Sequence, residues 1–120
     1  MESRFLHANL NVLDLEKSIN FYHQALGLHE VRRKEAKDGS FILAFLEDGK
    51  SDFQLELTWL RDRKKPYDLG DNEHHLAFRV ESKEKAHELH QKMDCICYEN
   101  KEMGLYFISD PDGYWLEILD

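Results

Sequence analysis

Two histidines and two glutamates occupy matching places in the two halves of this 120-residue chain. His7 and His75 each begin an apolar, strand-like run, and Glu56 and Glu117 each lie between large apolar residues of a later run. A carboxylate in such surroundings is costly unless it is paired, protonated or bound to a metal. Imidazole and carboxylate together suit zinc, nickel, cobalt or iron and would be unusual for calcium. The four residues are predicted to close around one divalent ion.

An internal repeat supports this interpretation. With His7 placed on His75, the apolar residues that follow the two histidines also coincide, and the histidine-to-glutamate separations are similar, at 56−7 = 49 and 117−75 = 42 residues. Taken alone, a strand histidine is more often an ordinary hydrogen-bonded residue, and a glutamate between leucines more often lies on the wet face of a sheet. Recurrence of all four in register favours the metal. His74 points to the opposite face from His75, and the repeat selects His75.

The elements that must position these residues follow the same repeat. In the first half, the pattern predicts strands at 5–12, 28–34, 41–47 and 53–59, and a helix that begins after Asp14 and ends at Gly27. In the second half it predicts strands at 75–80, 95–98, 105–109 and 114–119, the last following an Asp-Pro-Asp-Gly turn. A second helix is expected from Ser82, with Ala86, Leu89 and Met93 on one face.

These elements form two βαβββ modules in one α+β domain, residues 1–120. Module one is expected at 1–60 and module two at 74–120, with a polar connecting loop at 61–73 that contains Pro66 and Gly70. The length is that of one domain with a sizeable core.

Composition narrows the partners and the compartment. The net charge of −8 argues against nucleic acid, because phosphate binding needs a basic face. No apolar run approaches a membrane span, and the first residues lack the pattern of a signal peptide. Cys95 and Cys97 are expected on one face of a strand, too close in sequence for a structural disulfide. Two free thiols in a cytoplasmic protein are expected, and their role stays open.

Over nearly its full length the chain resembles the glyoxalase I (lactoylglutathione lyase) branch of the vicinal oxygen chelate superfamily. The matching segments are Leu6-His7, Phe21-Tyr22 with Leu26-Gly27, Leu55-Glu56-Leu57-Thr58, Tyr67-Asp68-Leu69-Gly70, His75-Leu76-Ala77 and the run from Asp110 to Glu117. The resemblance implies that two tandem βαβββ modules form an incomplete barrel around a metal site. Its ligands would be His7, Glu56, His75 and Glu117.

The resemblance also implies an assembly, a metal and a reaction. A homodimer with sites at the interface is expected, His7 and Glu56 coming from one chain and His75 and Glu117 from the other, although a single-chain site is also known in the superfamily. Nickel or cobalt would be favoured, with zinc as the alternative. The hemithioacetal of methylglyoxal and a thiol, usually glutathione, would be isomerised to an S-lactoyl thioester. The metal would stabilise an ene-diolate, Glu117 would move the proton, and Glu56 would serve the other face of the substrate.

Two departures leave the thiol open. Asn11 and Leu60 stand where related enzymes carry an arginine and often an asparagine for glutathione. Asn11 and its repeat equivalent, Arg79, are the substrate-binding candidates. A basic cluster in the connecting loop could also contribute, or could be a solvated loop: Arg61, Arg63, Lys64 and Lys65.

Other members of the superfamily are the alternatives. An iron dioxygenase would use two histidines and one carboxylate, which leaves Glu56 unexplained. An epimerase would more often carry glutamine at that position, and a thiol transferase of the fosfomycin-resistance type would lack the Glu56 signature. A metal-free drug-binding protein would have no use for all four ligands.

Overall fold

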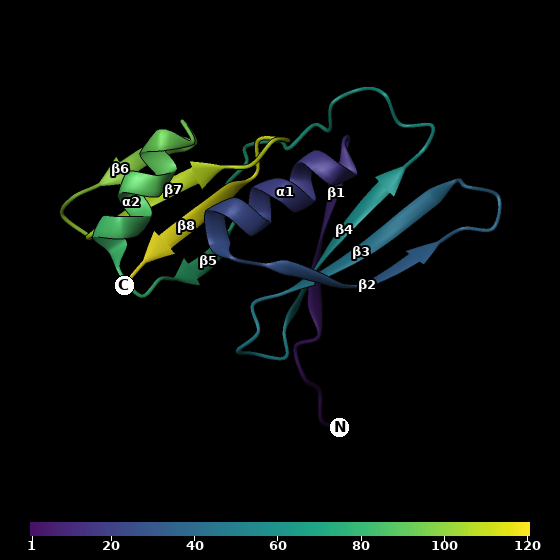
Figure 1. The fold of residues 1–120 in the computed structure, drawn as a ribbon, viewed down its shortest axis with the longest axis horizontal. Coiled ribbons are helices and arrows are strands. Elements are labelled where there is room, and N and C mark those ends of the chain that lie inside the picture. The colour runs from purple at the N-terminus through teal and green to yellow at the C-terminus, as the bar shows by residue number, and fades with distance from the viewer. The chain divides into compact units, whose positions relative to one another are not determined.

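The computed structural model describes residues 1–120 and divides them into two compact units, Met1–Tyr67 and Asp68–Asp120. Each unit is a four-stranded sheet with one helix, so the predicted α+β fold of two βαβββ modules is confirmed (Figure 1). Neither helix has the length and apolar character needed to cross a membrane.

The first unit follows the predicted order of strand, helix and three strands. Its elements are β1 (His7–Val12), α1 (Leu15–Leu26), β2 (His29–Glu35), β3 (Phe41–Glu47) and β4 (Gln54–Leu60). The sheet order is β1-β4-β3-β2, in which β1 and β4 are parallel and the other pairs antiparallel (Figure 1). Helix α1 leads from β1 to β2 at the opposite edge of the sheet, and the antiparallel run from β2 through β3 to β4 brings the last strand of the unit back beside the first.

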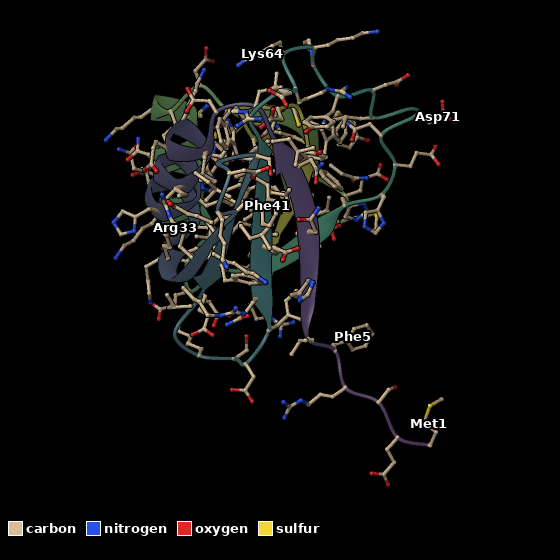
Figure 2. All side chains as sticks on the ribbon, turned by 90° about the vertical axis from the view of Figure 1, so that its right-hand side faces the viewer. Met1, Phe5, Arg33, Phe41, Lys64 and Asp71 are labelled. Atoms are coloured by element: carbon tan, nitrogen blue, oxygen red, sulfur yellow. The ribbon has the colours of Figure 1, made fainter.

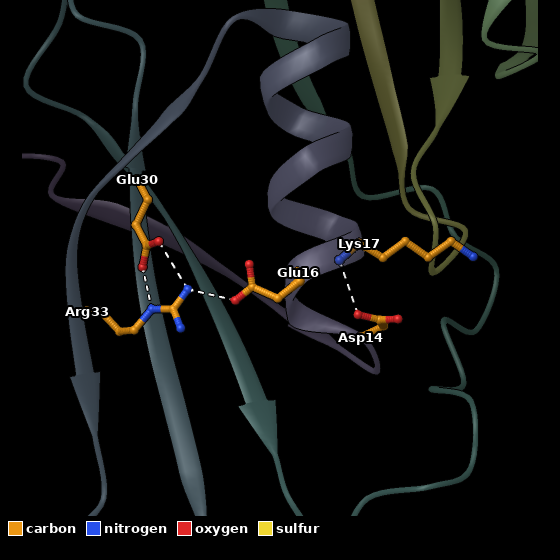
Figure 3. A network of polar contacts seen from close by, with 5 residues as sticks. All are labelled: Asp14, Glu16, Lys17, Glu30 and Arg33. Carbon is orange, nitrogen blue, oxygen red and sulfur yellow. Dashed lines mark hydrogen bonds and ion pairs between the residues drawn. The ribbon is translucent and has the colours of Figure 1, made fainter.

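Local polar contacts fix both ends of α1. The side chain of Asp14 accepts a hydrogen bond from the backbone nitrogen of Lys17 at 3.1 Å, and Gly27 takes the left-handed conformation, with φ of 70°. Arg33 on β2 bridges Glu16 on the helix and Glu30 on its own strand, at 3.0 and 2.6 Å (Figure 3). Hydrogen bonds to these carboxylates raise the pKa of Arg33 above its usual range.

The second unit repeats the order. Its elements are β5 (Leu76–Arg79), α2 (Lys83–Lys92), β6 (Ile96–Asn100), β7 (Leu105–Ser109) and β8 (Trp115–Leu119). The sheet order is β5-β8-β7-β6, again with the first and last strands parallel (Figure 1). In both units, therefore, a strand that begins at or directly after a histidine lies beside a glutamate-bearing strand.

The structure corrects the predicted start of β1. The strand begins at His7 rather than Phe5, although the carbonyl of Leu6 still accepts from the nitrogen of Gln54 at 3.1 Å. Phe5 is 91% exposed and lies with Met1 on an extended arm (Figure 2). An apolar residue such as Phe5 is typical of a strand, but β1 can pair only as far as its neighbour extends, and β4 begins at Gln54, the partner of His7.

The buried face of α2 also differs from the expectation. Leu89 is 41% exposed, whereas His90 is fully buried and its Nδ1 lies 2.8 Å from the hydroxyl of Tyr106. Hydropathy assigns leucine to the core before histidine, but a buried imidazole is tolerated when a partner satisfies it.

The two cysteines do not share an environment. Cys95 precedes β6 and is buried, whereas Cys97 is exposed at a register shift between Ile96 and Tyr98. The prediction that both lie on one face of a regular strand is therefore wrong, because the bulge breaks the alternation. Burial raises the pKa of Cys95 from its usual 9.0 to about 11 and raises that of Tyr106 as well.

These shifts predict a loss of stability in alkali. A thiol with a raised pKa in the fold contributes stability that is fully present below pH 9.0 and is lost as pH rises through about 11. The free energy of unfolding, measured by urea titration at each pH, should therefore fall over this window. Cys95→Ala should flatten the fall and Cys97→Ala, at the exposed thiol, should change it less. An equal slope in wild type and Cys95→Ala would contradict the assignment.

Candidate metal centre

In the first unit the structure brings His7 and Glu56 together. Strand register sets Asn9 opposite Glu56, and His7 lies two residues before Asn9 on the same face. The Nε2 of His7 is 3.7 Å from Oε1 of Glu56, and the glutamate side chain is only 14% exposed. Leu55 and Leu57 are buried on the opposite face, as alternation requires.

The second unit builds the same pair from the same geometry. Ala77 lies opposite Glu117, and His75 lies two residues before Ala77. The Nε2 of His75 is 3.7 Å from Oε1 of Glu117, whose side chain is 18% exposed. The two pairs thus have equal separations and similar burial, although they arise from independent strand pairings.

A phenylalanine beside each pair is a feature that the sequence reasoning missed. Phe45 on β3 lies opposite Glu56, and Phe107 on β7 lies opposite Glu117. Each ring meets its histidine edge-on, with centroids 6.1 Å apart at His7 and 5.1 Å at His75. The signal was available, because each phenylalanine precedes its glutamate by a similar interval, 56−45 = 11 and 117−107 = 10 residues. The repeated unit is therefore a histidine, a glutamate and a phenylalanine.

The neighbours of the two pairs differ in chemistry. Near His7, Thr58 donates to Asn9, Asn9 donates to Asn11 at 2.8 Å, and Asn11 lies 3.4 Å from the hydroxyl of Tyr67. This polar chain runs along the face that carries Glu56.

Near His75 the neighbours are aromatic. The ring of Tyr98 stacks on that of Trp115 with centroids 6.2 Å apart, and Phe107 contacts both. One pair therefore has hydrogen-bonding neighbours and the other has an apolar wall.

The substrate-binding candidates lie on these same faces. Asn11 shares the face of His7 by alternation, and Arg79 shares that of His75. Arg79 is exposed, and its Nε donates to the carbonyl of Asp120 at 2.9 Å. In the basic cluster, the Nη1 of Arg61 donates to the carbonyl of Asp38, and Arg63 donates to two loop carbonyls and lies 4.2 Å over the ring of Tyr67. These loop contacts favour a structural role for both cluster arginines.

The donor chemistry of the four residues fits a divalent transition metal. Within each unit two donor atoms lie 3.7 Å apart, beyond hydrogen-bonding distance. Donors that bind one ion at about 2.0–2.2 Å lie at most about 4.4 Å from each other, so the separation in each pair is compatible with a shared ion. No group of three or more histidine, cysteine or acidic side chains is gathered in the structure. Each unit therefore brings together two such donors, one imidazole and one carboxylate.

Known proteins share both the sequence and the fold. The family model described as the Glyoxalase/Bleomycin resistance protein/Dioxygenase superfamily matches residues 4–118. A lactoylglutathione lyase of Neisseria meningitidis serogroup A is 36% identical, over 97% of this chain and 89% of its own length. A probable lactoylglutathione lyase of Synechocystis is 35% identical, over 95% of this chain and 92% of its own length.

Among solved structures, the trypanothione-dependent glyoxalase I of Leishmania major superposes with a TM-score of 0.87 at 32% identity. The match covers 99% of this chain and 87% of the Leishmania chain. A full-length family match, relatives above 30% identity and the shared fold agree with one another. This chain belongs to the Glyoxalase/Bleomycin resistance protein/Dioxygenase superfamily.

Proposed function

We propose that this protein is a lactoylglutathione lyase of the glyoxalase I type, which detoxifies methylglyoxal. Its substrate is the hemithioacetal of methylglyoxal and a small thiol, and its product is the S-lactoyl thioester. The observation that carries the proposal is the histidine–glutamate pair at 3.7 Å, which occurs once in each unit. The names of the similar proteins, lactoylglutathione lyase and glyoxalase I, support the same function.

Four side chains would hold the metal: His7, Glu56, His75 and Glu117. A divalent ion bound there would supply a Lewis acid for the oxygens of the substrate. Nickel or cobalt is our choice, with zinc as the alternative, because imidazole and carboxylate donors suit these ions. The Nδ1 of His75 lies 2.9 Å from the carbonyl of Glu73, which can only accept, so this nitrogen carries the proton and Nε2 is free to bind.

The reaction itself is a proton shift between neighbouring carbons. Glu117 would remove the proton from C1 of the hemithioacetal and return a proton to C2, while the hydroxyl proton passes from the oxygen on C1 to the oxygen on C2, so that the C1 hydroxyl becomes a carbonyl and the C2 carbonyl becomes a hydroxyl. Atoms and charge balance with no further reactant. Glu117 is mostly buried beside Phe107 and Trp115, which limits the access of water. Glu56 would act on the opposite face of the substrate.

Glu56 also separates this function from the dioxygenase alternative. An iron site of two histidines and one carboxylate would leave this residue without a role. Glu56 instead stands in the same relation to His7 as Glu117 does to His75, at the same distance. The symmetry of the pairs favours two carboxylate ligands over one.

The cosubstrate, assembly and location are the finer parts of the proposal. Glutathione or a similar small thiol would lie along the polar chain that includes Asn11, with Arg79 as a second contact. Because each unit offers two donors, we propose a homodimer in which each site takes His7 and Glu56 from one chain and His75 and Glu117 from the other. The free thiols Cys95 and Cys97 favour a reducing cytoplasm.

Metal removal tests the function directly. The protein stripped with a chelator should lose thioester formation from methylglyoxal and glutathione, and nickel or cobalt chloride should restore it, followed by ultraviolet absorbance. A panel of small thiols run beside glutathione identifies the cosubstrate, and metal analysis of the purified protein identifies the ion. Full activity of the stripped protein, or no turnover with nickel, cobalt or zinc and any thiol, would contradict the proposal.

A further inference from the structure

The two histidines of the proposed metal centre are held in different ways. His7 follows the extended arm that carries Phe5, and its recorded contacts are the ring of Phe45 and Glu56. His75 has in addition the carbonyl of Glu73, 2.9 Å from its Nδ1. A backbone carbonyl therefore fixes the ring of His75, whereas the ring of His7 contacts only side chains.

A single side chain ties the segment before His75 to the turn before Glu117. Asn72 directly precedes Glu73, and its Nδ2 donates to the carbonyl of Gly113 at 2.9 Å across 41 residues of sequence. The backbone of Asn72 is in the left-handed region, with φ of 55°, and its nitrogen donates to the carbonyl of Leu69 at 3.0 Å. Few residues other than glycine adopt this conformation readily, and asparagine is one of them.

The turn that receives this hydrogen bond is itself rigid. The buried carboxylate of Asp110 accepts from the backbone nitrogens of Asp112 and Tyr114, both at 2.9 Å. The backbone nitrogen of Gly113 donates to the carbonyl of Asp110 at 3.0 Å, and β8 begins two residues later. Asn72 is therefore anchored to a fixed point at the start of the strand that carries Glu117.

We propose that Asn72 is a positioning residue of the metal centre: its hydrogen bond to Gly113 holds the Glu73 carbonyl against His75 and so orients the imidazole toward Glu117. This inference rests on the proposed function for the identity of the metal ligands. Groups that orient metal-binding histidines typically change metal affinity by roughly 10-fold to 100-fold when they are lost. Asn72 acts one step further out, through the backbone, so the lower end of that range is expected.

Two substitutions separate the hydrogen bond from the backbone conformation. Asn72→Gly keeps the left-handed conformation accessible and removes the donor, and Asn72→Asp keeps the shape but sets a carboxylate oxygen against the Gly113 carbonyl. Asp94→Gly is the matched control, because Asp94 has the same φ of 55° in the same unit, is exposed, and lies between α2 and β6, the strand at the opposite edge of the sheet from β5. Thermal unfolding of each variant shows that it is folded.

Affinity for nickel chloride alone, measured by calorimetry, should fall roughly 10-fold in both Asn72 variants and stay unchanged in Asp94→Gly. In the metal-free protein, ¹⁵N chemical shifts of His75 should show the Nδ1-protonated tautomer in wild type and a mixture in Asn72→Gly. Wild-type affinity and an unchanged tautomer in the Asn72 variants would overturn the positioning role and leave the proposed function intact. A wild-type protein that binds no nickel, cobalt or zinc would instead overturn the function, and the tautomer of His75 would still decide whether Asn72 orients the ring.

Discussion

Glu117→Gln is expected to lower kcat by roughly 10²–10⁴-fold, the range for loss of a general base. Glutamine keeps the size of the side chain and an oxygen that can accept a hydrogen bond, but it cannot take the proton from C1 of the hemithioacetal. The Oε1 of Glu117 lies 3.7 Å from the Nε2 of His75, and the Glu117 side chain is only 18% exposed. The measurement is kcat at saturating nickel, so that weaker metal binding does not enter.

Glu99→Gln is the matched control for this substitution. Glu99 also pairs with a histidine in the same unit, His87, but it lies on β6 beside Tyr106 rather than beside Phe107. Residues 106 and 107 point to opposite faces, so the Glu99 pair is on the other side of the sheet from Glu117. Turnover of Glu99→Gln should match wild type. Wild-type kcat in Glu117→Gln would remove that residue from the role of base and direct attention to Glu56.

Mixing two inactive variants is expected to restore activity. His7→Ala disables the first pair and Glu117→Gln disables the second, so each protein alone should be inactive. If each site takes its two pairs from different chains, a mixed dimer contains one doubly defective site and one intact site. Random reassembly makes half of the dimers mixed, so activity should return to about one quarter of the wild-type value per chain. The measurement is thioester formation after the two proteins are unfolded together and refolded.

A second mixture controls for unspecific recovery. His7→Ala with Glu56→Gln places both defects in the first pair, so every site in every dimer keeps one defect and no activity should return. Recovery in the first mixture alone would establish sites shared between chains. No recovery in either mixture, with dimers present by size-exclusion chromatography, would contradict the interface arrangement and assign all four ligands to one chain.

Much of the fold was readable from the sequence because its signals are local. Asp14 and Gly27 bound α1 as predicted, since a cap and a left-handed glycine act within one turn of their own position. Strands β3 and β7 match their predicted bounds, at Phe41–Glu47 and Leu105–Ser109, because Gly-containing turns flank continuous apolar runs. The repeat of His7 and Glu56 in His75 and Glu117 nominated the four candidate ligands for the same reason: residue type and spacing are properties of the chain alone.

Other features depend on strand pairing and side-chain contacts between distant segments, which cannot be predicted from one sequence alone. Phe45 and Phe107 join the histidine–glutamate pairs only because β3 and β7 lie next to β4 and β8 in register. His90 replaces Leu89 in the core because Tyr106, sixteen residues away, satisfies its ring.

The anchor at Asn72 shows the same limit most clearly. Its partner, the carbonyl of Gly113, is a backbone group 41 residues away. Because every residue has a backbone carbonyl, the residue type at position 113 does not indicate this contact. The sequence by itself nominated the four candidate ligands and predicted the elements that carry them. Tertiary structure alone decided that they pair at 3.7 Å within each unit and what holds each histidine in place, because register and loop closure are set by contacts far apart in the chain.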